Sequence, residues 1–168
     1  RDKKIFMEDV TSTVSFKNVT IIHEDDYDFD TGKFDIIGSL ILEGKNKTFT
    51  YSSDQVSRIL ENACLAIGPE CTFRYEPSIS SRNLLMLISN TSVLYLNSGI
   101  LSSSSVGLEL TKGTFLVDGL SSLINDGANA TESIQFGDGL DSDNNLCVEI
   151  DPAAKLTVDG FFTNANLE

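Results

Sequence analysis

The sequence has no tryptophan, a single histidine and only three cysteines. Because Cys64, Cys71 and Cys147 are odd in number, they cannot form a complete disulfide framework, and the sequence has no CxxC pair. A pairing of Cys64 with Cys71 across the turn between them stays open; the simpler interpretation is three partly buried thiols that pack as small apolar side chains. His23 lies far from every cysteine, so zinc binding and thiol catalysis lack the required spacing.

Basic residues are few as well, since 12 Lys and Arg face 25 Asp and Glu, for a net charge of −13 at pH 7. This charge repels phosphate backbones and anionic membrane surfaces, which argues against nucleic-acid binding. Long apolar runs are missing too, and residues 1–4 (RDKK) lead into no apolar signal core, so we expect no membrane insertion. The length predicts a single domain over residues 1–168, large enough to fold without a disulfide or metal.

The sequence also lacks the short motifs of common catalytic sites. It contains no Gly-x-Ser-x-Gly, no His-Glu-x-x-His and no phosphate-binding loop. His23 stands beside acidic residues; a general base is one interpretation, and we favour a surface imidazole with a pKa raised by those neighbours. We therefore predict no catalytic, cofactor-binding or metal-ligating residues, and a protein that is not an enzyme.

The feature that the sequence does contain is a repeat. Four segments share the pattern apolar-any-apolar, a short turn, and apolar-any-apolar again. The paired triplets are 65–67 with 73–75, 85–87 with 93–95, 108–110 with 115–117, and 148–150 with 156–158. Leu65, Leu85, Leu108 and Val148 begin these copies at intervals of 20, 23 and 40 residues, and the last interval spans two periods. Repeats of this length, none able to bury its apolar face alone, are typical of solenoids.

The residues within each copy favour strands over helices. Apolar residues alternate with period two, and turn-forming pairs such as Asp118-Gly119 and Asp159-Gly160 follow them. We therefore predict an all-β, right-handed parallel β-helix (β-solenoid) of roughly seven coils of about 20–23 residues, with Leu65, Leu85, Leu108 and Val148 aligned along its axis. The amino-terminal third is less regular, and residues 23–35 are predicted to be an acidic insertion loop between early coils.

Residues 14–21 (VSFKNVTI) and 148–160 (VEIDPAAKLTVDG) resemble right-handed parallel β-helix proteins, most closely the adhesin-type passenger repeats of bacterial surface proteins. The resemblance implies an extracellular or cell-surface location and a structural or adhesive role. Pectinases and polysaccharide lyases share this fold, but the clustered Asp, adjacent His and basic triplet of pectinases are missing. We therefore carry no catalytic residue over from them.

Two acidic stretches are candidates for structural calcium, the only cofactor that we consider. Asp26, Asp28 and Asp30 alternate within the first stretch. If Asp26 is position one of an EF-hand loop, Thr31 and Ile37 stand where the loop requires Gly and Glu, so the stretch is not an EF-hand. The second stretch carries Asp138, Asp141 and Asp143. A solvated acidic loop and ordinary turn composition are the alternatives to calcium at the two places.

The outward residues of the second triplets suggest how the protein contacts partners. They are predicted to be Arg74, Leu94, Leu116 and Thr157. Stacking would make Leu94 and Leu116 neighbours, either in a lateral contact with another copy or under a loop. Both ends lack a polar capping helix, so the chain is either a fragment of a longer repeat array or binds other copies head to tail in a fibre.

These features lead to one principal hypothesis on function and two alternatives. The principal hypothesis is a non-enzymatic extracellular or surface β-solenoid with a structural or adhesive role that self-assembles axially. The alternatives are a carbohydrate-active β-helix enzyme, and an adhesin module that binds glycans or proteins of a host or neighbouring cell.

Overall fold

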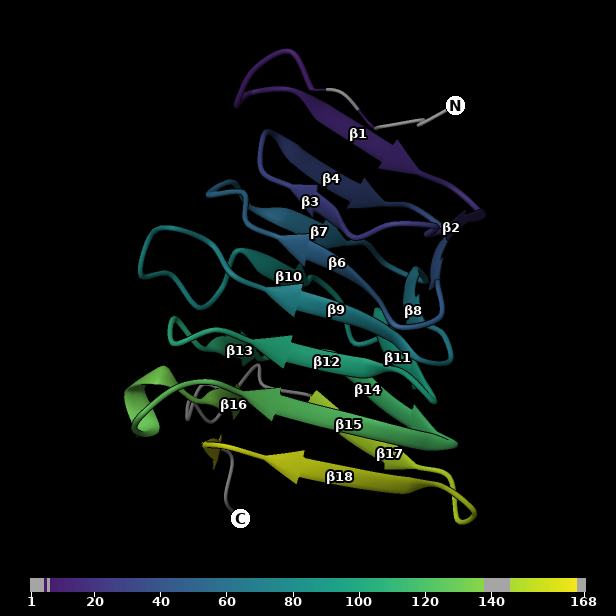
Figure 1. Ribbon diagram of the computed structural model, residues 1–168, viewed down its shortest axis with the longest axis vertical. Helices are drawn as coiled ribbons and strands as arrows, with labels where there is room; N and C mark the ends of the chain where they lie inside the picture. Colours follow the sequence, from purple (N-terminus) through teal and green to yellow (C-terminus); the bar gives the residue numbers. More distant parts are fainter. Residues whose placement is uncertain (1–4, 6, 138–145, 166–168) are drawn as a thin grey trace.

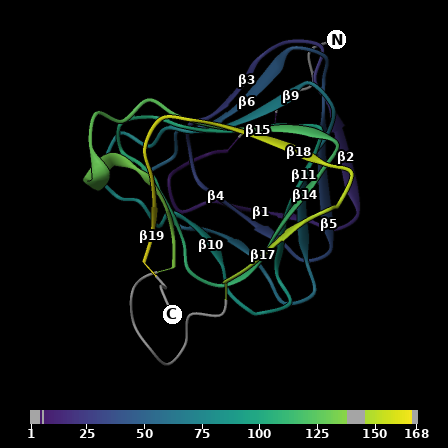
Figure 2. The same cartoon turned by 90° about the horizontal axis from the view of Figure 1, so that it is seen from below.

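A computed structural model describes residues 5, 7–137 and 146–165. These residues form a parallel β-solenoid of about six turns, close to the number of coils expected from the repeat. Each turn contributes one strand to each of three faces, which we name A, B and C (Figure 1). Seen along the axis, the chain passes from A to B to C counterclockwise as it approaches the viewer, so the solenoid is right-handed (Figure 2).

The strands follow this order without exception in the part of the chain that the structure describes. Face A consists of two sheets: a four-stranded sheet of β1 (Thr13–Phe16), β4 (Lys33–Ile36), β7 (Ser57–Ile59) and β10 (Leu85–Leu87), and a three-stranded sheet of β13 (Leu108–Leu110), β16 (Ile134–Phe136) and β19 (Phe162–Asn164). Face B contains β2 (Val19–Ile22), β5 (Ser39–Glu43), β8 (Cys64–Ile67), β11 (Val93–Asn97), β14 (Gly113–Asp118) and β17 (Leu146–Ile150). Face C contains β3 (Tyr27–Phe29), β6 (Lys47–Tyr51), β9 (Cys71–Tyr75), β12 (Ile100–Ser103), β15 (Leu120–Asn125) and β18 (Lys155–Asp159).

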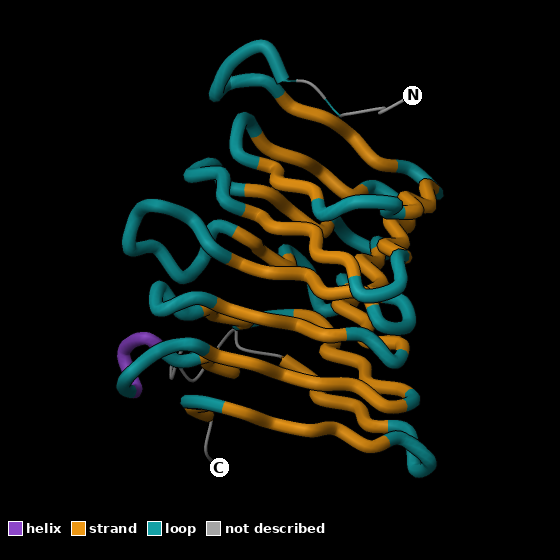
Figure 3. The backbone as a smooth tube through the Cα atoms, in the orientation of Figure 1, coloured by secondary structure: helices purple, strands orange, loops and turns teal. Residues whose placement is uncertain are grey.

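Loops join the faces at three corners, where the strands of Figure 3 end and the teal tube begins. The longest described loops join face C to face A, at residues 76–84 and 126–133, and the second contains a short 3₁₀ helix, η1 (Ala130–Glu132). No helix among the described residues has the length and apolarity to cross a membrane.

The core consists of columns in which equivalent side chains of successive coils lie one above the other. On face B, Leu40 pairs with Leu65, Leu65 with Leu94, and Leu94 with Phe115, and all four are fully buried. Burial of one such side chain is worth about 1.5–3 kcal/mol. The alternation of buried and exposed positions along each short strand therefore produces a continuous apolar interior.

Aromatic rings fill the interior of face C in the amino-terminal half. Phe49 stacks on Phe73 with centroids 5.7 Å apart, and Tyr51 stacks on Tyr75 at 5.9 Å. The Tyr75 hydroxyl donates to the Ser81 carbonyl at 2.6 Å, so the buried ring retains a polar partner. Burial raises the pKa of Tyr51 to about 12.

The corner between faces B and C uses the same backbone conformation in four successive coils. Asn46, Glu70, Ser98 and Gly119 have φ values of 54°, 56°, 56° and 61°. This left-handed conformation turns the chain sharply and costs least for Gly and Asn. The Asp118-Gly119 turn seen in the sequence is therefore one member of a column of equivalent turns.

The predicted fold is confirmed, but the predicted register of the repeat is wrong. Each pair of triplets forms two consecutive strands, yet the pairs do not begin on the same face, because a coil has three strands and the recognised pattern contains two. Leu65 and Val148 lie on face B, whereas Leu85 and Leu108 lie on face A. The single axial line expected for these residues is therefore absent, and Leu65 aligns with Leu94 instead.

Two further expectations are corrected in the first coils. Residues 23–35 are not an insertion loop, because β3 and the start of β4 lie within them and pair in register with β6 and β7. Leu94 does not point outward, because its pairing with Leu65 places it in the core, where its exposed fraction is 0%. Leu116 does point outward and is half-buried, but its cross-strand neighbour is Tyr95. A lateral contact through both leucines is therefore ruled out.

Candidate functional site

The two ends of the described solenoid differ in how well their core positions are covered. At the carboxyl-terminal end, β17 and β18 each have a single neighbouring strand in the described part of their sheets, β14 and β15. At the amino-terminal end, Ile5 and Met7 pack against the first coil. Candidate binding surfaces therefore lie at both ends, and they differ in chemistry.

The carboxyl-terminal coil exposes apolar side chains at core positions. Val148 pairs with Phe115, and the exposed fractions of the two are 48% and 0%. Val158 pairs with Leu123, and here the fractions are 52% and 2%. Ile150, two residues further along β17, is 49% exposed and pairs with the fully buried Val117. We name Val148, Ile150 and Val158 the terminal apolar stripe; within the described residues its strands also present an unpaired backbone edge.

The amino-terminal coil is covered in part, near β3, by residues that precede it. The Tyr27 hydroxyl donates to the Ile5 carbonyl at 2.9 Å, and Phe16 and Phe29 in the same coil are buried. The first and last coils therefore differ, although the sequence predicted open ends at both.

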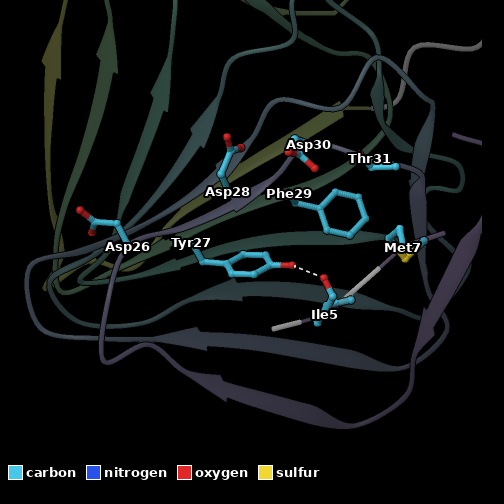
Figure 4. A pocket seen from close by; sticks show the side chains of 8 residues that line it. All are labelled: Ile5, Met7, Asp26, Tyr27, Asp28, Phe29, Asp30 and Thr31. Atoms are coloured by element: carbon cyan, nitrogen blue, oxygen red, sulfur yellow. Dashed lines mark hydrogen bonds between the residues drawn. The ribbon is translucent and has the colours of Figure 1, made fainter. Parts of the chain in front are cut away.

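A cavity of about 510 Å³ lies between this covering segment and β3 (Figure 4). Ile5 and Met7 line one side, and the six consecutive residues 26–31 line the other. The rings of Tyr27 and Phe29 point toward Ile5 and Met7, as Figure 4 shows. Successive residues of a strand point to opposite faces, and all six of residues 26–31 line the cavity. The cavity therefore follows the backbone edge of β3, and we name it the β3 groove.

The three aspartates of the first calcium candidate, Asp26, Asp28 and Asp30, lie along this groove. An Asp26 carboxylate oxygen accepts a hydrogen bond from the Thr48 backbone N–H at 2.9 Å, and Asp28 accepts one from the Ser52 hydroxyl. Alternate residues of a strand are about 6.6 Å apart, so Asp26, Asp28 and Asp30 form a row and do not converge on one point. Among the described residues, no group of three or more His, Cys, Asp or Glu side chains is placed to hold a metal ion.

Other residues from the sequence predictions take up separate places. Asp138, Asp141 and Asp143 lie outside the described residues, so the second calcium candidate stays a prediction. Cys64, Cys71 and Cys147 are free thiols, half-buried, buried and exposed respectively, and Cys64 does not pair with Cys71.

Of the predicted outward residues, Arg74 and Thr157 do lie on the outer surface of face C. The Arg74 guanidinium forms ion pairs at 2.8 Å with both Glu76 and Asp126. These contacts join β9 to the loop after β15, so Arg74 has partners within the chain.

His23 is buried, which corrects its interpretation as a surface imidazole. Its exposed fraction is 8%, and its ring lies 5.7 Å from Phe49 and 6.3 Å from Tyr27, centroid to centroid. Burial lowers the pKa of His23, and the nearby Asp26 carboxylate opposes this only in part. Its Nε2 has no hydrogen-bond partner in the part of the chain that the structure describes.

Sequence reasoning missed the β3 groove altogether. The signal was the alternation Tyr27, Asp28, Phe29, Asp30, which has the period of a strand with one apolar and one acidic face. Treating this stretch as a loop hid that pattern. Comparisons of this chain with models of known protein families, with curated proteins and with solved structures gave no match.

Proposed function

We propose that this chain is a non-enzymatic, structural or adhesive β-solenoid of an extracellular or cell-surface assembly, and that it associates axially through its last coil. The observation that carries the proposal is the terminal apolar stripe: Val148, Ile150 and Val158 occupy core positions and are about half exposed. A stack of parallel strands suits such a role, because it keeps its shape over many coils and presents a template for the next one.

The occupant that we propose for this surface is a second copy of the chain. Covering the exposed half of each stripe side chain is worth about 1 kcal/mol, and pairing along the free strand edges adds to this. The net charge of −13 on each copy opposes the contact. We therefore expect weak association that strengthens as salt screens the repulsion.

The covered amino-terminal end bears on the form of the assembly. Two carboxyl-terminal coils that meet give a closed pair, whereas a last coil seated on the first coil of the next copy gives a filament. In the second arrangement the segment that contains Ile5 and Met7 has to move, since it covers Phe29 and Tyr27. The mass of the assembly separates the two arrangements.

The test compares the native chain with a triple variant, Val148→Thr, Ile150→Thr and Val158→Thr, by light scattering coupled to size exclusion over a range of concentrations and NaCl. Thr retains β-branching and removes apolar surface at positions that are already exposed. We expect the native mass to rise with concentration and salt, and the triple variant to stay monomeric. Glu149→Gln, on the outer side of the same strand, is the control and should associate like the native chain. A native chain that stays monomeric at every concentration in high salt contradicts the proposal.

A further inference from the structure

We propose that the β3 groove binds an extended peptide of alternating apolar and basic residues, which adds to face C as a further strand. The inference does not depend on axial association, because the groove lies at the opposite end of the solenoid from the terminal apolar stripe. It rests on three properties of the groove: its backbone edge, its two kinds of side chain, and its charge.

In the part of the chain that the structure describes, the backbone edge of β3 on the side of the groove has no paired strand. Within the described residues, β3 pairs with one strand only, β6. The Phe29 carbonyl accepts hydrogen bonds from the Ser52 and Ser53 N–H groups, at 3.1 Å and 3.0 Å, so it points toward β6. Backbone groups alternate in direction along a strand, and those of Asp28 and Asp30 therefore point to the open edge. An extended peptide placed there would supply partners for them.

The side chains of the groove match an alternating peptide. Successive residues of a strand point to opposite faces, so every second side chain of an added strand faces the same way as Tyr27 and Phe29. Those side chains would extend the apolar contact with Ile5 and Met7, which line the far side of the cavity. The intervening side chains would follow the acidic row of Asp26, Asp28 and Asp30.

Charge selects a basic occupant. In the described part of the chain, no Lys or Arg forms an ion pair with Asp26, Asp28 or Asp30. Basic residues at every second position of the peptide would have the same spacing as the aspartates, and opposite charges across neighbouring strands are stabilising. A second copy is a poorer occupant, because its last described strand on face C ends in Asp159 and its net charge is −13.

The probe is a labelled, acetylated and amidated peptide of alternating lysine and valine, and its binding is followed by fluorescence anisotropy. We expect saturable binding that weakens about tenfold or more when NaCl is raised, and little binding of the matching glutamate–valine peptide. Asp28→Asn should weaken binding severalfold through lost charge. Asp28→Pro should abolish it, since proline removes the N–H that points to the open edge and places its ring there.

Matched controls keep the test specific. Glu61→Gln, an equal loss of charge at an exposed corner of another coil, should bind like the native chain. The triple variant at Val148, Ile150 and Val158 should also bind normally, so this proposal and the axial association can fail separately.

Three results would overturn the inference. The first is that Asp28→Asn and Asp28→Pro weaken binding of the lysine–valine peptide equally. The second is that the glutamate–valine peptide binds as well as the lysine–valine peptide. The third is that the peptide binds only after Lys3→Gln and Lys4→Gln, which would assign the groove to the chain's own basic residues. If Asp28→Pro does not fold, hydrogen exchange of the native chain decides. The Asp28 and Asp30 amides should exchange more slowly with the peptide bound, and unchanged exchange refutes strand addition.

Discussion

At the scale of single residues, position within a strand determines whether an apolar side chain is structural or available for contact. Leu94 and Leu116 have the same chemistry and lie in neighbouring strands of face B. Leu94 faces the core and is fully buried, whereas Leu116 faces outward beside Tyr95. A shift of one residue in strand register exchanges these roles.

Alanine substitutions at these two leucines should therefore differ in their effect on stability. Leu94→Ala leaves a cavity in the core and should lower the free energy of unfolding by about 2–5 kcal/mol. Leu116→Ala removes a half-exposed side chain and should cost less than about 1 kcal/mol. Urea denaturation followed by circular dichroism measures both, and equal losses would contradict the assigned register.

His23 predicts how stability responds to mild acid. Its pKa is lowered by burial in the folded state, from an ordinary value of 6.5, so the unfolded chain binds the proton more readily. The stability that neutral, buried His23 contributes to the folded state is fully present above pH 6.5. It is lost as the pH falls from there toward the lower pKa of His23 in the folded state. The Phe49 and Tyr27 rings pack on the imidazole, and Asp26 is the carboxylate that opposes the shift.

The measurement is the free energy of unfolding between pH 7 and pH 5 for the native chain and for His23→Phe. The native chain should lose stability over this interval, and the variant should lose distinctly less, because phenylalanine does not titrate. Asp9 and Asp54 do not confuse the comparison, since their pKa values are lowered by hydrogen bonds from Thr11 and Ser78 and they titrate at lower pH. Parallel pH profiles for the two proteins would show that His23 is not responsible.

At the scale of strands and corners, the solenoid depends on how closely consecutive turns approach. A Cβ atom added to Gly99 would lie 2.4 Å from the Ile67 carbonyl oxygen in the coil before it. At the equivalent corner one coil earlier, a Cβ on Gly68 would lie 3.0 Å from the Leu42 carbonyl oxygen. The corner between β11 and β12 therefore has less room than the corner between β8 and β9.

This difference predicts unequal costs for the same substitution. Gly99→Ala should destabilise the chain by about 1–3 kcal/mol, because the backbone of β8 has to shift, and Gly68→Ala should cost distinctly less. Thermal or urea unfolding of the two variants tests the comparison. If Gly68→Ala were the more harmful change, the stacking of these two corners would be wrong.

At the scale of the whole molecule, each coil contacts only its neighbours, so stability is expected to vary along the axis. The central coils have a coil on both sides, whereas the last described coil has a described partner on one side and half-exposed core residues such as Val148. Opening should therefore begin at the carboxyl-terminal end, where the fewest apolar contacts are lost.

Hydrogen exchange should display this gradient directly. Amides of β8 and β11 should be the best protected on face B, and amides of β17 should be less protected than these. Raising the protein concentration in high salt should slow exchange in β17 and β18 selectively, because a second copy would cover those strands. Uniform protection along the axis would contradict both the gradient and the proposed role of the last coil.

The sequence by itself determined that this chain forms short parallel strands wound into a coil. That information is local: apolar alternation with period two in Leu108-Glu109-Leu110, turn residues such as Asp118-Gly119, and recurrence at short intervals. Only the tertiary structure decided which strands stack. The three-strand coil moved Leu85 to face A and Leu94 into the core, because pairing partners are selected by contacts between residues more than 20 positions apart.

The two candidate surfaces depend on the same long-range contacts. Residues 26–31 become the side of a groove only when Ile5 and Met7 lie against the first coil. Ile150 is half exposed because it occupies the last described coil, whereas its pairing partner Val117, one coil earlier, is fully buried. Strand periodicity is set by each residue and its neighbours in the chain, whereas burial is set by which coil packs on which.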